Sequence, residues 1–93
     1  EIIMAVTIIH VVLASNPVEV ELPTGAVVRG CVGEDDPILF VEVDSEAEGT
    51  EARTFAVYSA GEAHHTDATV YVGSACEPYT DQYIHIYELV AAP

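Results

Sequence analysis

The fold of this chain is most constrained by a series of short β-favouring runs, each closed by turn residues, and by the lack of any sustained helical period. Residues 18–22 show the pattern, since three apolar side chains alternate there with Glu19 and Glu21. In an extended strand this alternation puts the apolar side chains on one face and the carboxylates on the other. Such runs recur at intervals of about 8 to 15 residues, which is typical of a small β sandwich or barrel.

This pattern predicts strands at residues 5–13, 18–22, 26–32, 38–44, 53–58, 69–72 and 83–90. Pro17 ends the first strand because it has no amide hydrogen to donate to a ladder. The Gly, Asp and Pro residues of 33–37 predict a hairpin between the third and fourth strands, and residues 45–52 and 59–68 predict exposed loops. We therefore expect one all-β domain over residues 1–93, a small antiparallel sandwich or partly closed barrel of about seven strands.

The charge of the chain restricts its partners. Sixteen carboxylates face two arginines and no lysine, which gives a formal net charge of −14. A surface of this sign repels polyanions, so direct binding to nucleic acid or to an anionic membrane is excluded. Four explanations stay open: adaptation to high salt, recognition of a basic protein, imitation of nucleic-acid phosphates, and a solubilising surface without a partner.

The acidic residues are concentrated in one part of the sequence. Ten of the sixteen lie between Glu19 and Glu51, and the only basic residue within that segment is Arg29. We expect these carboxylates to form one largely unpaired negative face that binds a protein partner. The candidate binding residues are Glu19, Glu21, Glu34, Asp35, Asp36, Glu42, Asp44, Glu46, Glu48 and Glu51.

Tyrosines in the C-terminal third supply a second candidate surface. Tyr79, Tyr83 and Tyr87, together with Tyr58 and Tyr71, combine a large contact area with a polar tip, and tyrosine is enriched in protein interfaces for that reason. The first three are our candidate interface residues. The alternative is ordinary packing at the edge of a small β domain.

No motif predicts catalysis, a metal or a cofactor. His64 and His65 stand near Asp67, but adjacent side chains of an extended segment point to opposite sides, and no HExxH or CxxC spacing accompanies them. His85 alternates with tyrosines on the last strand, which favours a histidine paired across strands over a catalytic one. The sequence does not place any Ser, Cys or Thr beside a general base and a third group that orients that base, as nucleophilic catalysis requires. We therefore expect a protein that is not an enzyme and holds no cofactor.

Neither the N-terminal run nor the cysteines indicate export. Residues 2–14 are mostly apolar but fall short of the roughly 20 residues of a membrane span, and they follow Glu1 instead of the basic segment of a signal peptide. Cys31 and Cys76 do not make a disulfide framework, and their strand-like surroundings predict free buried thiols.

Five short segments carry a resemblance to a known family: residues 21–27, 37–44, 53–58, 71–73 and 84–88. They resemble a family of small uncharacterised proteins encoded by tailed phages and prophages, in which ELPKGA, LWALVDP, RTF, YVGT and WHLYE segments recur in this order. The resemblance covers residues 18–89. The chain departs from it at Thr24, where the family has lysine, at Phe40, where it has tryptophan, and at residues 60–62, where it has Gly-His. The resemblance implies a viral origin and no defined biochemical activity.

Three functions follow as expectations. The first is a non-catalytic phage accessory protein whose acidic face binds a host factor or defence protein, including by imitation of nucleic acid. The second is a structural virion protein, a capsid or tail decoration that assembles with itself or its neighbours through β edges. The third is a protein that sequesters a small molecule, although the shortage of cations disfavours an anionic ligand. The expected locations are the host cytoplasm or the virion, without a transmembrane segment.

Overall fold

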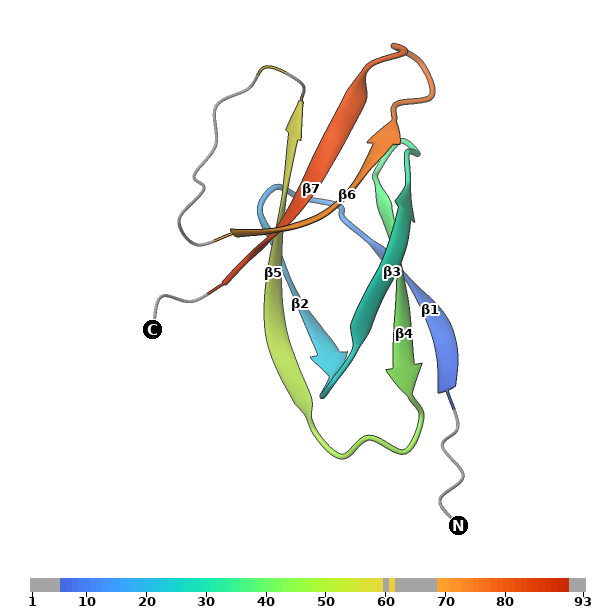
Figure 1. Ribbon diagram of the computed structural model, residues 1–93, viewed down its shortest axis with the longest axis vertical. Helices are drawn as coiled ribbons and strands as arrows, with labels where there is room; N and C mark the ends of the chain where they lie inside the picture. Colours follow the sequence, from blue (N-terminus) through green and yellow to red (C-terminus); the bar gives the residue numbers. More distant parts are fainter. Residues whose placement is uncertain (1–5, 60, 62–68, 91–93) are drawn as a thin grey trace.

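Seven strands form two antiparallel sheets packed face to face (Figure 1) in a computed structural model that describes residues 6–59, 61 and 69–90. Sheet A has the strand order β1-β4-β3 and sheet B the order β2-β5-β7-β6. Their bounds are β1 Val6–Val12, β2 Val18–Pro23, β3 Val27–Val32, β4 Ile38–Asp44, β5 Thr50–Ser59, β6 Thr69–Cys76 and β7 Tyr83–Leu89. The predicted all-β sandwich is confirmed, and the sheets do not close into a barrel.

The predicted strands differ from the observed ones mainly in length. The hairpin between β3 and β4 is confirmed, and β4 has the predicted bounds. β5 begins at Thr50, earlier than predicted, because residues 50–52 pair with β2 up to Pro23; this part of the loop predicted at 45–52 is therefore strand. β6 continues past the predicted end to Cys76, which pairs with Tyr83. The loop predicted at 59–68 lies, except for Ser59 and Gly61, outside the described residues.

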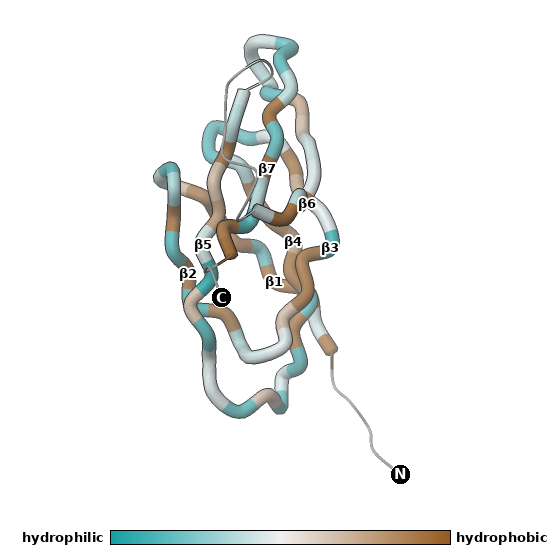
Figure 2. Tube along the Cα trace, turned by 60° about the vertical axis from the view of Figure 1, so that its left-hand side comes forward, coloured by the Kyte–Doolittle hydropathy of each residue, from teal (hydrophilic) through white to brown (hydrophobic). Residues whose placement is uncertain are grey.

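The core lies between the two sheets and follows from the alternation within each strand. Leu39 and Val41 of β4 point inward from sheet A, and Leu22, Phe55 and Ile86 point inward from sheet B; each is at most 2% exposed. The hydropathy colouring shows apolar segments along the strands and hydrophilic turns at both ends of the molecule (Figure 2). Because the core lies between the sheets, the turns lie at the two ends of the sandwich. Most of their side chains are exposed and can contact a ligand or a partner. None of the described residues forms a helix suited to crossing a membrane.

An ion pair closes the end of the sandwich where β5 begins and β7 ends. The Arg53 guanidinium donates hydrogen bonds from Nε and Nη2 to both carboxylate oxygens of Glu88, each at 2.7 Å, and from Nη1 to the carbonyl of Ala26, the residue before β3 of sheet A. The two side chains are only 17% and 19% exposed. The hydrogen bond to Glu88 raises the pKa of Arg53, against the opposing effect of burial, so this group links the two sheets as a permanent cation.

The edges of the two sheets meet where β3 lies beside β6. A Cβ atom added at Gly33 would lie 2.0 Å from the carbonyl oxygen of Cys76, and one added at Gly73 would lie 3.3 Å from the Cys31 sulfur. The Cys31 thiol points to the carbonyl of Ser74, with the sulfur 3.5 Å from that oxygen. The glycines therefore let the two edge strands approach more closely than side chains would allow. Each of these edge strands shields the other from pairing with another chain.

The cysteines partly contradict the sequence prediction. Both thiols are free, as expected, but Cys31 is only half-buried and Cys76 is exposed. The reason is the strand register: Cys76 stands opposite Tyr83 on the outer face of sheet B, whereas Cys31 stands opposite the fully buried Leu39.

This difference predicts unequal thiol reactivity. Burial raises the pKa of the Cys31 thiol above its ordinary value of 9.0, so its thiolate is scarcer at pH 8 and the sulfur is harder to reach. We expect iodoacetamide to label Cys76 at least about tenfold faster than Cys31 in the native protein, as measured by peptide mass spectrometry over time. In denaturant the two rates should converge, and equal rates in the native protein contradict the burial of Cys31.

The raised pKa also makes the stability of the fold depend on pH. Because the folded state holds the proton of the Cys31 thiol more tightly than the unfolded state does, this thiol leaves the free energy of unfolding unchanged below pH 9.0 and lowers it as the pH rises further.

Candidate functional site

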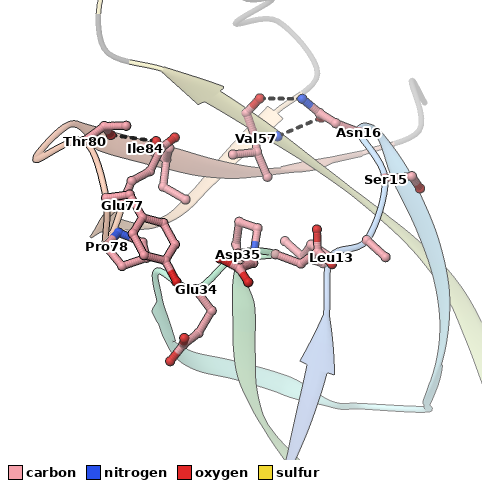
Figure 3. Close-up of a pocket in the computed structure, with 14 residues that line it drawn as sticks. Leu13, Ser15, Asn16, Glu34, Asp35, Val57, Glu77, Pro78, Thr80 and Ile84 are labelled. Atoms are coloured by element: carbon pink, nitrogen blue, oxygen red, sulfur yellow. Dashed lines mark hydrogen bonds between the residues drawn. The ribbon is translucent and has the colours of Figure 1, made fainter.

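The described residues enclose a pocket at the end of the sandwich where three connections meet. Its walls are residues 13–16 between β1 and β2, residues 34–37 between β3 and β4, and residues 77–80 between β6 and β7, with Val57 and Ile84 from sheet B. We call it the end pocket. It has a volume of about 410 Å³ and opens to solvent. Figure 3 shows Asn16 and Val57 together on one side of it and Glu77, Pro78 and Thr80 on the other.

Hydrogen bonds hold the three connections in place. The Asn16 side chain donates to the carbonyl of Val57 at 2.7 Å and accepts from its amide at 2.9 Å, as a neighbouring strand would do. The Leu13 amide donates to the carbonyl of Pro37 at 2.8 Å, which ties the β1–β2 connection to the β3–β4 turn. In the β6–β7 turn, the Thr80 hydroxyl donates to the Glu77 carboxylate at 2.8 Å. These hydrogen bonds hold the connections that form the pocket walls, two of them by joining one wall to the backbone of another segment.

The end pocket combines an acidic rim with an apolar floor. Glu34, Asp35 and Asp36 are exposed at its rim, Glu77 is half-exposed, and none of the lining residues is Lys, Arg or His. The two arginines of the chain lie elsewhere, because one is paired with Glu42 and the other with Glu88. The apolar part of the lining comes from Leu13, Val57, Ile84, Ala14, Pro37 and Pro78. This arrangement suits a cationic group with an apolar stem.

The ten predicted binding carboxylates do not form one face, which corrects the sequence prediction. The register of the strands and the positions of the turns distribute them over both outer faces and both ends. Glu19 and Glu21 lie on the outer face of sheet B, Glu42 and Asp44 on the outer face of sheet A, Glu34, Asp35 and Asp36 at the end pocket, and Glu46, Glu48 and Glu51 at the opposite end. Only three of the ten gather at the pocket.

Several of these carboxylates already have partners. Glu42 accepts a hydrogen bond from Arg29 at 2.9 Å in an exposed ion pair. Glu21 accepts one from the Thr50 hydroxyl at 3.0 Å. Asp44 accepts one from the Glu46 amide at 2.9 Å, which shapes the turn between β4 and β5. Of these three, only Glu42 has a cationic partner, so the negative charges of Glu21 and Asp44 are not neutralised by these contacts.

The predicted tyrosine interface is divided between two places. Tyr83 and Tyr87 lie on the outer face of sheet B, whereas Tyr79 lies in the β6–β7 turn, 82% exposed, beside the end pocket. On the sheet face Tyr87 packs edge to face against Tyr58 at 5.8 Å and against Tyr71 at 5.3 Å between ring centroids. These contacts favour packing for Tyr87 and leave Tyr79 as the aromatic side chain available at the pocket.

His85 is paired across strands, as expected. Its Nδ1 lies 2.8 Å from the Ser74 hydroxyl, which also contacts the Tyr71 hydroxyl. This is a nucleophile beside a base, a contact that the sequence did not predict. It lies on the open outer face of sheet B, and the lining of the end pocket does not include it.

The histidines do not gather into a metal site within the described residues. His10 lies on sheet A with its ring edge to face with Phe40 at 4.9 Å, and His85 belongs to sheet B. No group of three potential ligands is found in the part of the chain that the structure describes. His64, His65 and Asp67 lie outside it.

Sequence reasoning missed most of the end pocket. Asn16, Glu77 and the apolar residues Leu13, Val57 and Ile84 were not candidates, because they are far apart in sequence and each has an ordinary role in its own strand or turn. A weak signal existed in Asn16, an amide side chain in the connection after the apolar first strand and directly before proline. Such residues often hydrogen-bond to nearby backbone, but the sequence does not reveal that the backbone is that of Val57.

Comparison with known proteins identifies a family to which the sequence is similar. The model of the family described as domain of unknown function (DUF7352) matches residues 4–93. No curated protein and no solved structure matches the chain. The match includes every segment that builds the end pocket and both sheets, so the whole sandwich belongs to the region that the family model describes.

Proposed function

The chain belongs to the DUF7352 family over residues 4–93, and for this member we propose a non-catalytic function: binding of a basic protein partner at the end pocket. The observation that supports the proposal is the acidic rim over an apolar floor, formed by three connections and lined by no cationic residue. With a net charge of −14, the chain attracts a basic partner from a distance, and the end pocket offers that partner both rim carboxylates and apolar contacts.

A lysine or arginine side chain of the partner fits this chemistry. Its aliphatic stem can lie against Leu13, Val57 and Ile84 while its charged end meets the rim carboxylates. Tyr79 adds an exposed ring beside the rim, and aromatic faces attract cations. Because most of the rim is exposed, the attraction acts mainly on the association rate and is weakened by salt.

The resemblance to phage-encoded proteins suggests the biological setting of this binding. In that setting the chain acts in the host cytoplasm as an accessory protein that occupies the basic surface of a nucleic-acid enzyme or a defence protein. The rim residues Glu34, Asp35 and Asp36 present successive negative charges, which is the property that a nucleic-acid mimic needs.

Neutralising the rim tests this proposal. We expect the triple variant Glu34→Gln, Asp35→Asn, Asp36→Asn to lose at least about tenfold in the amount of basic host protein retained from an extract at about 50 mM salt. The wild-type chain should retain such proteins at that salt concentration and release them at about 0.5 M. Retained proteins are identified and quantified by mass spectrometry.

A matched control separates the pocket from the overall charge. The variant Glu19→Gln, Glu46→Gln, Glu48→Gln removes the same number of charges from exposed carboxylates away from the pocket. It should retain the partner within about twofold of wild type. If both triple variants lose the same proteins equally, net charge is responsible and the end pocket is not the binding site.

The second candidate function, a virion component, is favoured by a different observation. β1 is an edge strand with three exposed apolar side chains, Val6, Ile8 and Val12, each about half exposed, and open edges take up strands from neighbouring proteins. Detection of the chain in purified phage particles, resistant to a salt wash, would support this function over the first.

A further inference from the structure

A nucleophile and a base lie side by side on the outer face of sheet B. Ser74 of β6 stands opposite His85 of β7 in the antiparallel ladder, so the two side chains project from the same face. The Oγ atom of Ser74 lies 2.8 Å from Nδ1 of His85, and the Tyr71 hydroxyl contacts the same oxygen. Ser74 is exposed and His85 is half-buried, so a reagent can reach the hydroxyl while the imidazole is partly enclosed.

An irregularity in β6 brings the third group, the Tyr71 hydroxyl, to this pair. Tyr71 and Ser74 are three residues apart, a spacing that places side chains on opposite faces of a regular strand. The ladder with β7 shifts register between Tyr71 and Gly73, and a bulge of this kind redirects the side chains beside it. Tyr71 and Ser74 therefore both stand on the outer face, opposite Tyr87 and His85.

Contacts on both faces of sheet B hold the pair in position. From the inner side, the Cys31 sulfur lies 3.5 Å from the carbonyl oxygen of Ser74. On the outer side, the His85 ring lies 6.3 Å from the Tyr71 ring, and Tyr71 packs edge to face against Tyr87 at 5.3 Å. The strand backbone and the rings thus keep the hydroxyl and the imidazole within hydrogen-bond reach of each other.

The hydrogen-bonding capacity of these groups defines their chemistry. A hydroxyl carries one proton, so when Ser74 donates to Nδ1 of a neutral His85, its oxygen can still accept a hydrogen bond from Tyr71. The neutral imidazole is then placed to take the serine proton while the serine oxygen attacks an electrophilic carbon. This is the relation between nucleophile and base that activates a serine.

We propose that Ser74 is an acyl acceptor that reacts with uncharged carboxylic esters, with His85 as its general base. The Ser74 oxygen bonds to the carbonyl carbon of the ester while its proton passes to Nδ1 of His85. The bond from that carbon to the leaving oxygen then breaks, and the proton passes from Nδ1 to the leaving oxygen. The products are an acyl ester of Ser74, a free alcohol and neutral His85.

Charge and the neighbouring rings select the class of ester. The net charge of −14 repels anionic acyl donors such as acyl phosphates and coenzyme A thioesters. Tyr71 and Tyr83, which are 54% and 58% exposed, present ring surface on the same face as the pair. Aromatic groups pack favourably against such rings, so an uncharged aryl ester suits this surface.

Acetylation by para-nitrophenyl acetate, followed by nitrophenol absorbance and peptide mass spectrometry, tests the proposal. We expect Ser74 to be acetylated at least about tenfold faster than Ser15, an exposed serine in the β1–β2 connection. His85→Asn keeps a hydrogen-bond acceptor but not a base, and should slow acetylation of Ser74 at least about tenfold. The control His10→Asn changes a histidine of sheet A and should leave the rate unchanged.

The possible results separate the two roles. Acetyl groups on His85 instead of Ser74, or equal rates at Ser74 and Ser15, would overturn the nucleophile, and an unchanged rate in His85→Asn would overturn the base. The comparison of the two serines uses the wild-type chain, so it does not depend on the folding of a variant. The triple end-pocket variant should be acetylated at Ser74 at the wild-type rate, because neither Ser74 nor His85 lines that pocket. Failure of end-pocket binding therefore leaves the reactivity of Ser74 intact.

Discussion

Replacement of Gly33 by alanine is expected to destabilise the protein by at least about 2 kcal/mol. The added Cβ atom would lie 2.0 Å from the carbonyl oxygen of Cys76 and 2.8 Å from its carbonyl carbon. These are backbone atoms, so no side chain can rotate away, and β3 and β6 must separate where the two sheets meet. In a domain of this size such a loss lowers the melting temperature by about 10 °C or more, which calorimetry or circular dichroism measures.

The matched control is Gly30, a glycine within β3, the strand that ends just before Gly33. A Cβ atom at Gly30 would lie 3.7 Å from the Phe40 ring, an ordinary van der Waals distance, and alanine is less costly than glycine in a strand. We expect Gly30→Ala to change stability by less than about 1 kcal/mol. Equal stability of the two variants contradicts the close contact between the edges, and with it the conclusion that these edges are shielded.

Loss of Arg53 is the second large expected effect. Arg53→Met should cost about 2 to 4 kcal/mol, because it leaves the Glu88 carboxylate without a partner at a mostly buried position and removes the bond to the carbonyl of Ala26. Arg53→Lys should recover only part of this loss, because an ammonium group cannot form the two parallel bonds that Arg53 makes. Chemical denaturation of each variant gives the free energies of unfolding.

Two comparisons sharpen this prediction. Arg29→Met removes the other arginine, whose pair with Glu42 is exposed, and should cost less than about 1 kcal/mol. The double variant Arg53→Met, Glu88→Met should be less destabilised than the sum of the two single changes, since it leaves no unpaired buried charge. Strict additivity would show that the two side chains do not interact in solution.

The pH dependence of this ion pair follows from the direction of the shift. The pKa of Arg53 is raised in the folded state, chiefly by the hydrogen bond to Glu88. A base with a raised pKa contributes stability below its unfolded pKa and loses it only as the pH rises through the folded value. Arginine titrates above the range in which proteins are studied, so the contribution of Arg53 should stay constant through neutral and alkaline pH.

Local sequence was sufficient to predict where most strands lie, because each strand depends mainly on the alternation of apolar and polar residues within it. Residues 38–44 have one apolar face and are bounded by turn residues, and the strand has those bounds. The hairpin between β3 and β4 followed from the turn residues 33–37 in the same way. The extension of β5 to Thr50 did not, because it depends on a ladder with Pro23 and Leu22 of a strand distant in sequence.

Charge density along the sequence was a poor guide to charge density in space. The β class, the approximate strand positions and the sign of the surface charge could be predicted from the sequence alone, because alternation, turn residues and composition act locally or on the whole chain. Only the folded structure shows which carboxylates meet, how Arg53 joins the sheets, where the end pocket forms and that β1 lies at the edge of its sheet. Each of these depends on strand order and register, which are set by packing between segments far apart in the chain.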